Sequence, residues 1–202
     1  MLKNSLTIGC LALAALFALP VVGQEAASAQ AEQAESAPMI EVAKPTKAHR
    51  VIFKELGTWE GDMTMFMGPE PIKSKCTEVN RKFGAFWMTS SFTYELNGET
   101  MRGRGQFAYR KDKGGYYGTW VDSNSDIMSL MTGEYDADAK TMTYMMKNKD
   151  PNGEDVVMRI VTTMTSETTK DFNMSMQLPD GNWATVMTVA FKKVDTPKKK
   201  AK

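Results

Sequence analysis

The sequence predicts an all-β fold: a single antiparallel up-and-down β-barrel of about ten strands with one short N-terminal helix. Three observations predict it. Apolar and polar residues alternate after Gly57, turn residues recur at a spacing of roughly 10–13 residues, and no long helical pattern interrupts the series. Full closure would remove exposed strand edges. A two-sheet sandwich is the alternative, but Gly103 and Gly105 would let a strand bend, which favours the barrel.

Residues 1–23 are predicted to be a signal peptide. A lysine precedes an apolar stretch at residues 6–22, and Gly23 places a small residue at the cleavage point. Ala29 marks a second candidate cleavage site. A transmembrane anchor is the alternative, but the stretch is short for one and Pro20 interrupts it. We therefore expect an exported protein, periplasmic or secreted, with no stable membrane anchor after cleavage.

Composition marks two further segments around the barrel domain, which we expect at residues 46–194. Residues 24–38 contain no aromatic and no β-branched residue, which predicts a flexible linker over 24–45. Residues 195–202 are expected to form a basic disordered tail. The chain has 25 Lys and Arg against 24 Asp and Glu, so it lacks the excess positive charge that nucleic-acid binding requires.

The two cysteines carry different expectations. Cys10 lies inside the apolar stretch, with too few residues before it and too many after it for a lipid attachment site. Cys76 is then the only cysteine of the processed chain, so an internal disulfide is impossible. We expect its thiol to be buried like a small apolar side chain, with an intermolecular disulfide as the alternative.

The expected helix covers residues 48–56, with Thr46 as its cap and Gly57 as the residue that ends it. Asn97-Gly98 is the clearest hairpin signal in the chain. The expected strands cover residues 58–67, 72–82, 88–96, 101–110, 116–122, 126–135, 141–148, 154–165, 168–178 and 183–193.

Several motifs recur in a definite order along the predicted barrel. They are His49, LGTWEG at 56–61, Gly68-Pro69, FGAFW at 83–87, GRGQFAY at 103–109, GTWVDS at 118–123 and GEYD at 133–136. In this order the motifs resemble the bacterial family catalogued as domain of unknown function 1579, over residues 46–194. The resemblance implies a shared fold and brings no assigned reaction.

Gly57-Thr58-Trp59 also resembles the Gly-x-Trp start of lipocalin-like (calycin) barrels. That resemblance implies that a short helix closes the barrel floor and that Trp59 plugs it. A basic residue late in the last strand, here Lys192 or Lys193, would stack over the indole. Haem-binding barrels hold iron through a histidine near the end of the barrel, whereas His49 lies before the first strand, so no haem and no other cofactor is predicted.

Catalytic groups are sparse. One histidine and one cysteine in the processed chain leave little for nucleophilic catalysis, and His49 in this position is more typical of a local hydrogen bond. Glu60, Asp122 and Asp126 could include a carboxylate pair, but residues 122–124 first predict a turn. An enzyme is therefore the least favoured class, and catalytic residues are not assigned.

Ligand binding is the favoured function. A barrel of about ten strands is wider than one that side chains just fill, which leaves room for a small, largely apolar ligand. Arg102 and Arg104 alternate with the apolar residues of their strand and are expected on the surface. The candidate ligand-binding residues combine aromatic bulk with polar tips: Trp59, Trp87, Phe107, Tyr109, Trp120 and Asp122.

Methionine supports a second hypothesis, because the full chain has 17 of them. Met63, Met65 and Met67 share one face of a predicted strand, and soft thioether ligands select Cu(I). Methionine is also a common core filler, so the row could simply be apolar packing. A third hypothesis is a structural or partner-binding barrel without a small ligand. The sequence does not indicate an oligomeric state.

Overall fold

The computed structural model describes residues 43–149 and 153–194. The predicted signal peptide, nearly all of the predicted linker and the basic tail lie outside these residues. Within the described ranges, none of the helices is long and apolar enough to cross a membrane. The description that follows concerns the unit that begins at Lys44.

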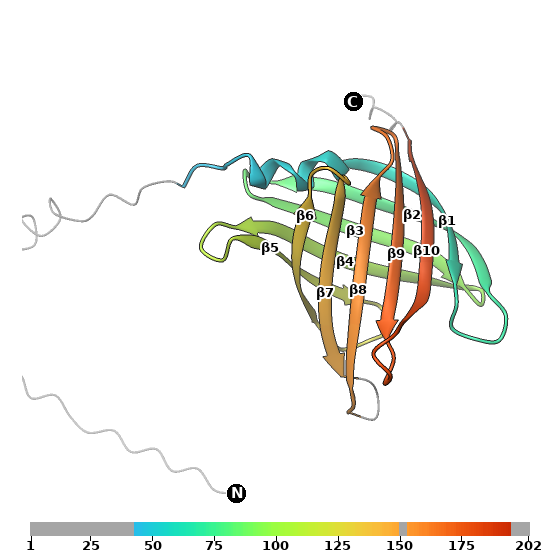
Figure 1. Cartoon of the computed structure of the whole chain (residues 1–202). Helices are drawn as coiled ribbons and strands as arrows, with labels where there is room; N and C mark the ends of the chain where they lie inside the picture. The colour runs from blue at the N-terminus through green and yellow to red at the C-terminus, as the bar shows by residue number, and fades with distance from the viewer. Residues whose placement is uncertain (1–42, 150–152, 195–202) are drawn as a thin grey trace, which may run out of the picture. The chain divides into compact units, whose positions relative to one another are not determined.

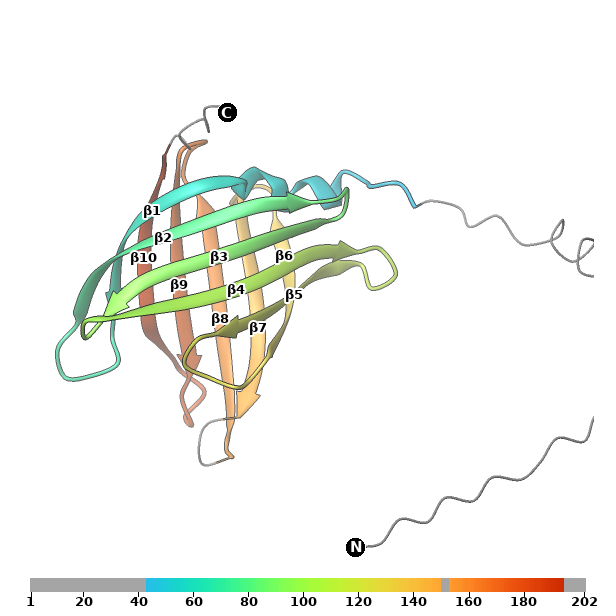
Figure 2. The same cartoon turned by 180° about the vertical axis from the view of Figure 1, so that it is seen from behind.

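Ten antiparallel strands form one closed barrel, in which each strand pairs with its neighbours in the chain and β1 pairs with β10 (Figures 1 and 2). The closed barrel confirms the predicted fold. The strands are β1 (Gly57–Met65), β2 (Ile72–Phe83), β3 (Trp87–Leu96), β4 (Glu99–Arg110), β5 (Gly115–Asp122), β6 (Ser129–Asp136), β7 (Thr141–Lys149), β8 (Asp155–Met164), β9 (Thr169–Gln177) and β10 (Trp183–Val194).

The period-two pattern places apolar residues inside and polar residues outside. In β1, Trp59 and Met63 are buried while Glu60 and Asp62 are exposed. Arg102 and Arg104 are likewise exposed on β4, as expected. At the β3–β4 hairpin, Asn97 and Gly98 have φ of 53° and 84°. Two successive left-handed residues match the twist of the flanking strands, which explains why this dipeptide marks the turn.

The predicted single helix is instead two short 3-10 segments, η1 (Ala48–Arg50) and η2 (Ile52–Glu55). Thr46 does not cap a helix, because its backbone N–H donates to Nδ1 of His49 at 3.0 Å and its hydroxyl contacts the same nitrogen at 2.9 Å. Gly57 follows with φ of 131°, a conformation that suits glycine, and leads directly into β1.

The two ends of the barrel differ. The closed end is the end where η1 and η2 lie, together with the β2–β3, β4–β5, β6–β7 and β8–β9 turns (Figure 1). The loop end is the opposite one, where the β1–β2, β3–β4, β5–β6 and β9–β10 connections lie. The 3-10 segments are bonded to strands around the closed end. Tyr116 donates to the Ala48 carbonyl at 3.1 Å, Lys54 donates to the Tyr135 hydroxyl at 3.0 Å, and Asn80 donates to the Glu55 carbonyl at 3.1 Å.

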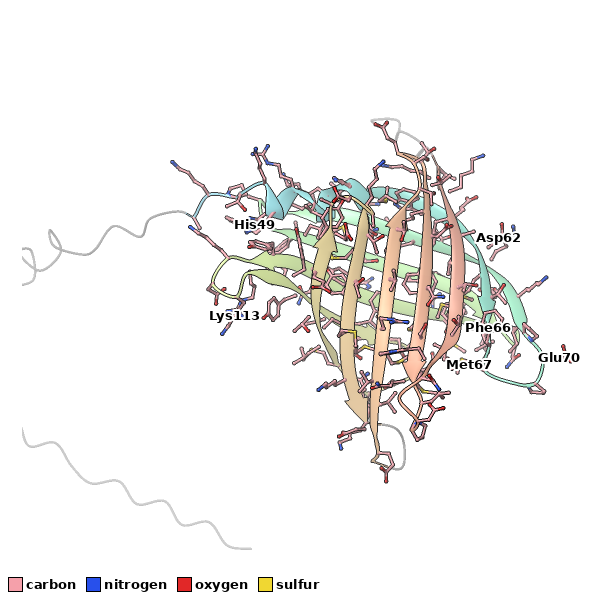
Figure 3. The ribbon with its side chains drawn as sticks, viewed as in Figure 1. His49, Asp62, Phe66, Met67, Glu70 and Lys113 are labelled. Carbon is pink, nitrogen blue, oxygen red and sulfur yellow. The ribbon has the colours of Figure 1, made fainter. Side chains whose placement is uncertain are left out.

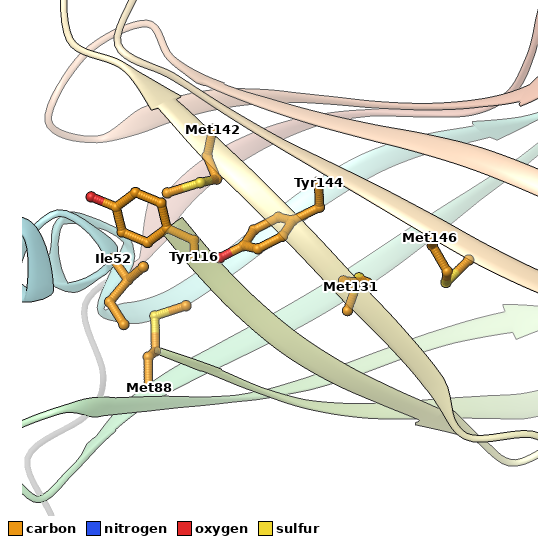
Figure 4. Close-up of a cluster of buried hydrophobic side chains, with 7 residues drawn as sticks. All are labelled: Ile52, Met88, Tyr116, Met131, Met142, Tyr144 and Met146. Atoms are coloured by element: carbon orange, nitrogen blue, oxygen red, sulfur yellow. The ribbon is translucent and has the colours of Figure 1, made fainter. Parts of the chain in front are cut away.

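Two clusters of buried side chains fill much of the barrel. One lies under the 3-10 segments and consists of Ile52, Met88, Tyr116, Met131, Met142, Tyr144 and Met146 (Figure 4). The other consists of Trp59, Met63, Met65, Cys76, Val189 and Phe191. The space between the side chains of these two groups is the site described next.

Candidate ligand-binding cavity

The barrel interior contains a cavity of about 160 Å³. Most of its wall is apolar, and five of the lining side chains are methionines. The lining residues are Ile52, Glu55, Glu78, Met88, Ser90, Phe92, Phe107, Trp120, Met131, Tyr144, Met146, Ile160, Thr162, Phe172, Met174, Met187, Val189 and Phe191.

Inward-facing glycines shape one side of this wall. Gly105 pairs with Trp120 across β4 and β5, and a methyl group on Gly103 would lie 2.2 Å from the Trp120 ring. Gly118 likewise pairs with Phe107, whose ring lies where a Cβ would be. The rings therefore lie flat against the strands instead of projecting into the barrel. This arrangement keeps the centre of the barrel open while burying large aromatic surfaces.

Trp59 plugs the closed end. Its indole is fully buried, and Nε1 donates to the Glu55 carbonyl at 2.8 Å. The Lys193 ammonium lies 5.3 Å from the centre of a Trp59 ring, which is the cation–π contact that the lipocalin-like pattern predicts. A second ammonium, that of Lys170, lies 4.8 Å from the indole. Lys192 is exposed on the outer face of β10.

Lys170 is the centre of a buried charged cluster. Its side chain is only 2% exposed, and its ammonium pairs with Glu55 at 2.8 Å and with Glu78. Burial lowers the pKa of this lysine, but the two carboxylates raise it by more, so its pKa lies above the ordinary value. The ammonium thus stays charged. The ion pairs connect η2, β2 and β9 at the closed end.

The predicted ligand-binding residues occupy three places. Phe107 and Trp120 line the cavity. Trp59 and Tyr109 belong to the closed end, where the Tyr109 ring packs edge-on against His49 at a centroid distance of 5.3 Å. The other two lie away from the cavity: Trp87 is 39% exposed outside the barrel, and Asp122 is exposed at the loop end, where it accepts an N–H from Asn124 at 3.0 Å.

The predicted methionine row does not share one environment. Met63 and Met65 are each 1% exposed inside the barrel, whereas Met67 lies beyond the end of β1 and is 76% exposed. A copper site built on this row would therefore have to rest on Met63 and Met65. Across residues 43–149 and 153–194, no group of three or more His, Cys, Asp or Glu side chains is placed to hold a metal ion.

The other residues considered for catalysis are His49, Cys76, Glu60, Asp122 and Asp126. His49 is buried and bonded to Thr46, as expected of a local hydrogen bond. Cys76 is buried as predicted, and burial raises the pKa of its thiol to about 12. Glu60, Asp122 and Asp126 are all exposed. The surroundings of His49 and Cys76 therefore do not activate either side chain as a nucleophile.

The sequence analysis missed the Lys170 cluster. The signal was present in the pattern, because Lys170 occupies the same face of its strand as Phe172 and Met174, which both line the cavity. A charged residue on an apolar strand face requires a buried partner. Glu78 and Glu55 are those partners, and the sequence did not show that they are close in space.

Three solved structures illustrate what this chain is similar to. The crystal structure of Rv2717c from M. tuberculosis is 10% identical, with a TM-score of 0.57, covering 74% of this chain and 99% of that chain. The S-type phycobiliprotein lyase CPES from Guillardia theta is 9% identical, with a TM-score of 0.47, covering 76% and 100%. A redesigned β-barrel is 15% identical, with a TM-score of 0.38, also covering 76% and 100%. The first likeness shows a shared fold.

At the level of sequence, no curated protein matches this chain. The model of the family described as "Protein of unknown function (DUF1579)" matches residues 44–193, which confirms the resemblance carried by the ordered motifs.

Proposed function

We propose that this chain, which belongs to the DUF1579 family of proteins of unknown function, binds a small, largely apolar molecule inside its barrel. The cavity of about 160 Å³ is the observation that supports the proposal. Protein interiors are normally packed so that few voids exceed the size of a water molecule. This space is several times larger than the roughly 30 Å³ that one water occupies in the liquid.

The size of the cavity limits the ligand. An engineered apolar cavity of about 150 Å³ in another protein stays dry and binds benzene. Sites for drug-sized molecules are larger, at about 300–1,000 Å³. The expected ligand therefore has an apolar body comparable with one six-membered ring. The methionines of the wall could adapt to its shape, because their side chains are unbranched and flexible.

The experiment is a titration monitored at the methionine methyl groups. The chain, purified as the cell processes it, is labelled with ¹³C at the methionine methyls and titrated with benzene. Binding in the cavity should shift the methyl signals of the five lining methionines and leave the exposed Met67 and Met128 unchanged. If no lining methyl shifts at saturation with benzene or with a one-ring amine, alcohol or acid, the barrel does not bind such a ligand, and a structural or partner-binding role takes its place.

A matched pair of variants tests the location. Thr162 lines the cavity, and its neighbour Val161 points to the outer face of β8. Thr162→Phe should fill the cavity and abolish the shifts, whereas Val161→Phe should retain them. Benzene binding that survives Thr162→Phe in a folded protein would place the ligand elsewhere.

We also propose that the chain is exported, on the strength of the signal-peptide pattern at residues 1–23. The intact mass of protein recovered from the envelope or medium of its own host tests this. A chain that begins at Gln24 or Gln30 supports export, and a chain that keeps the apolar segment contradicts it.

A further inference from the structure

The polar groups of the cavity are concentrated at the closed end. Glu55, Glu78, Ser90 and Tyr144 all line it, and the Ser90 hydroxyl donates to a Glu78 carboxylate oxygen at 3.3 Å. The neighbouring cavity wall is methionine and aromatic. A molecule in this cavity would therefore have one apolar part and one end facing the two carboxylates.

The two carboxylates that line the cavity outnumber the ammonium groups that pair with them. Glu55 and Glu78 share the single ammonium of Lys170. Lys193, the other ammonium near Trp59, forms no ion pair with either carboxylate within the described residues, and it does not line the cavity. The two carboxylates, whose side chains are 16% and 17% exposed, share one ammonium beside a mostly apolar space, so ion pairs neutralise their negative charge only in part.

Tyr144 adds an independent observation. The residue is 7% exposed and lines the cavity, yet among residues 43–149 and 153–194 its hydroxyl has no hydrogen-bond partner. In Figure 4 the hydroxyl points toward the side of the cluster where Ile52 and the 3-10 segments lie. Within the described residues, the hydroxyl oxygen is not one of the fully enclosed polar atoms that lack a partner, so it faces open space and can contact an occupant of the cavity.

We propose that the cavity takes a small amine, with an apolar body about the size of a benzene ring and a protonated amino group facing Glu55, Glu78 and Tyr144. This inference rests on the proposed function and adds the head group of the ligand. An ammonium supplies the missing positive charge, and its three N–H donors can serve both carboxylates and the tyrosine oxygen. A carboxylate ligand of the same size would add a third negative charge and should be rejected.

The test compares three one-ring molecules whose head groups differ in charge: benzylamine, benzyl alcohol and benzoate. Each is titrated into the ¹³C-methionine protein near neutral pH, with benzene as the neutral reference. We expect benzylamine to bind at least about tenfold more tightly than benzyl alcohol, and benzoate at least about tenfold more weakly. Affinity is read from the lining methyls, and Met67 and Met128 serve as internal controls.

Two variants locate the preference. Glu78→Gln removes one negative charge and should reduce the benzylamine advantage by about tenfold or more, with little change for benzyl alcohol. Tyr144→Phe keeps the ring and removes only the hydroxyl, and should weaken benzylamine more than benzene. The order of affinities in the unmodified protein is decisive by itself if a variant fails to fold.

The outcomes separate the two proposals. If benzene and benzyl alcohol bind but benzylamine binds no better than benzyl alcohol, the amine inference is wrong and the proposed function stands. If benzoate binds most tightly, the charge argument is overturned in the same way. If none of the four molecules shifts a lining methyl, the proposed function itself fails.

Discussion

The closed end and the loop end belong to the same continuous sheet, but they are stabilised differently. At the closed end, η1 and η2 are bonded to several strands, and the Lys170 ion pairs join η2 to β2 and β9. Large apolar side chains are exposed at both ends, Phe83 at the closed end among them, and Figure 3 shows Phe66 and Met67 on the β1–β2 loop of the loop end. Phe66 is 43% exposed and Met67 is 76% exposed.

The comparison shows where the stability and the selectivity of the barrel are located. Backbone hydrogen bonds between paired strands occur at both ends of the barrel, so these bonds do not make one end more stable than the other. The buried charges, the indole plug and the cavity-lining polar groups all lie toward the closed end, where a change should be costly. The loop end should tolerate substitution, because exposed loops with few buried contacts open and vary at little cost.

The largest effect is expected from Lys170→Met, because it leaves Glu55 and Glu78 without their shared ammonium. Breaking a buried ion pair from one side typically destabilises a protein by about 3–5 kcal/mol. Denaturant unfolding of the variant should show a loss of this size.

Lys75→Met is the matched control, since Lys75 pairs with Asp62 on the outer face of the barrel, where both are largely exposed. It should leave the free energy of unfolding unchanged. Equal losses in the two variants would mean that the closed end has no special role. The double variant Lys170→Met/Glu78→Gln should recover part of the loss, because it removes one of the unpaired carboxylates.

Gly103→Ala should have a smaller effect than Lys170→Met. Its methyl group would lie 2.2 Å from the Trp120 ring, so the indole must move into the cavity. Overpacking of this kind usually costs about 1–3 kcal/mol, and here it should also weaken benzene binding. Gly68→Ala at the loop end, where a Cβ would meet no atom within 4 Å, should be neutral in both measurements.

The overall architecture was predictable from local patterns. Apolar and polar residues that alternate with a period of two direct the apolar face of a strand into the barrel, and this does not depend on the sequences of the neighbouring strands. Asn97-Gly98 forms a turn through its own backbone conformation. The burial of Cys76 also followed from general preference. These features depend on a few adjacent residues.

The cavity was only partly predictable, because it depends on which residues meet across the barrel. Gly103 and Gly105 were interpreted as residues that let the strand bend, whereas their inward faces seat the Trp120 ring. Trp87 was predicted to bind the ligand for the same reason as Trp120, namely its aromatic side chain, but it lies on the outer face of its strand. Strand register decides both outcomes, and aromatic content alone does not report it.

The stability of the barrel should also depend on pH, through the ionisation of Cys76 and Lys170. Burial raises the pKa of Cys76 to about 12 from an ordinary value of 9.0, so the folded protein keeps this proton when the unfolded chain has lost it. The contribution is complete below pH 9 and is lost as the pH rises toward 12. Lys170 acts in the same direction at higher pH, because its folded pKa is also raised.

Cys76→Ala should therefore lose stability less steeply than the unmodified protein between pH 9 and 12, by up to about one proton in the slope of unfolding free energy against pH. Denaturant unfolding at several alkaline pH values measures this. Parallel slopes would show that the thiol ionises in the folded protein, and a thiol-specific reagent should then modify Cys76 before unfolding.

The smallest effect is expected from Met67→Ala at the loop end. The side chain is 76% exposed, and exposed substitutions usually change stability by no more than about 0.5 kcal/mol. Met65→Ala, two residues earlier and 1% exposed, should destabilise by about 2–5 kcal/mol through loss of packing. The same pair tests the copper hypothesis, because a shared Cu(I) site would lose affinity in both variants. If Met67→Ala lowers Cu(I) affinity without affecting stability, Met67 on the β1–β2 loop takes part in Cu(I) binding although its side chain is exposed.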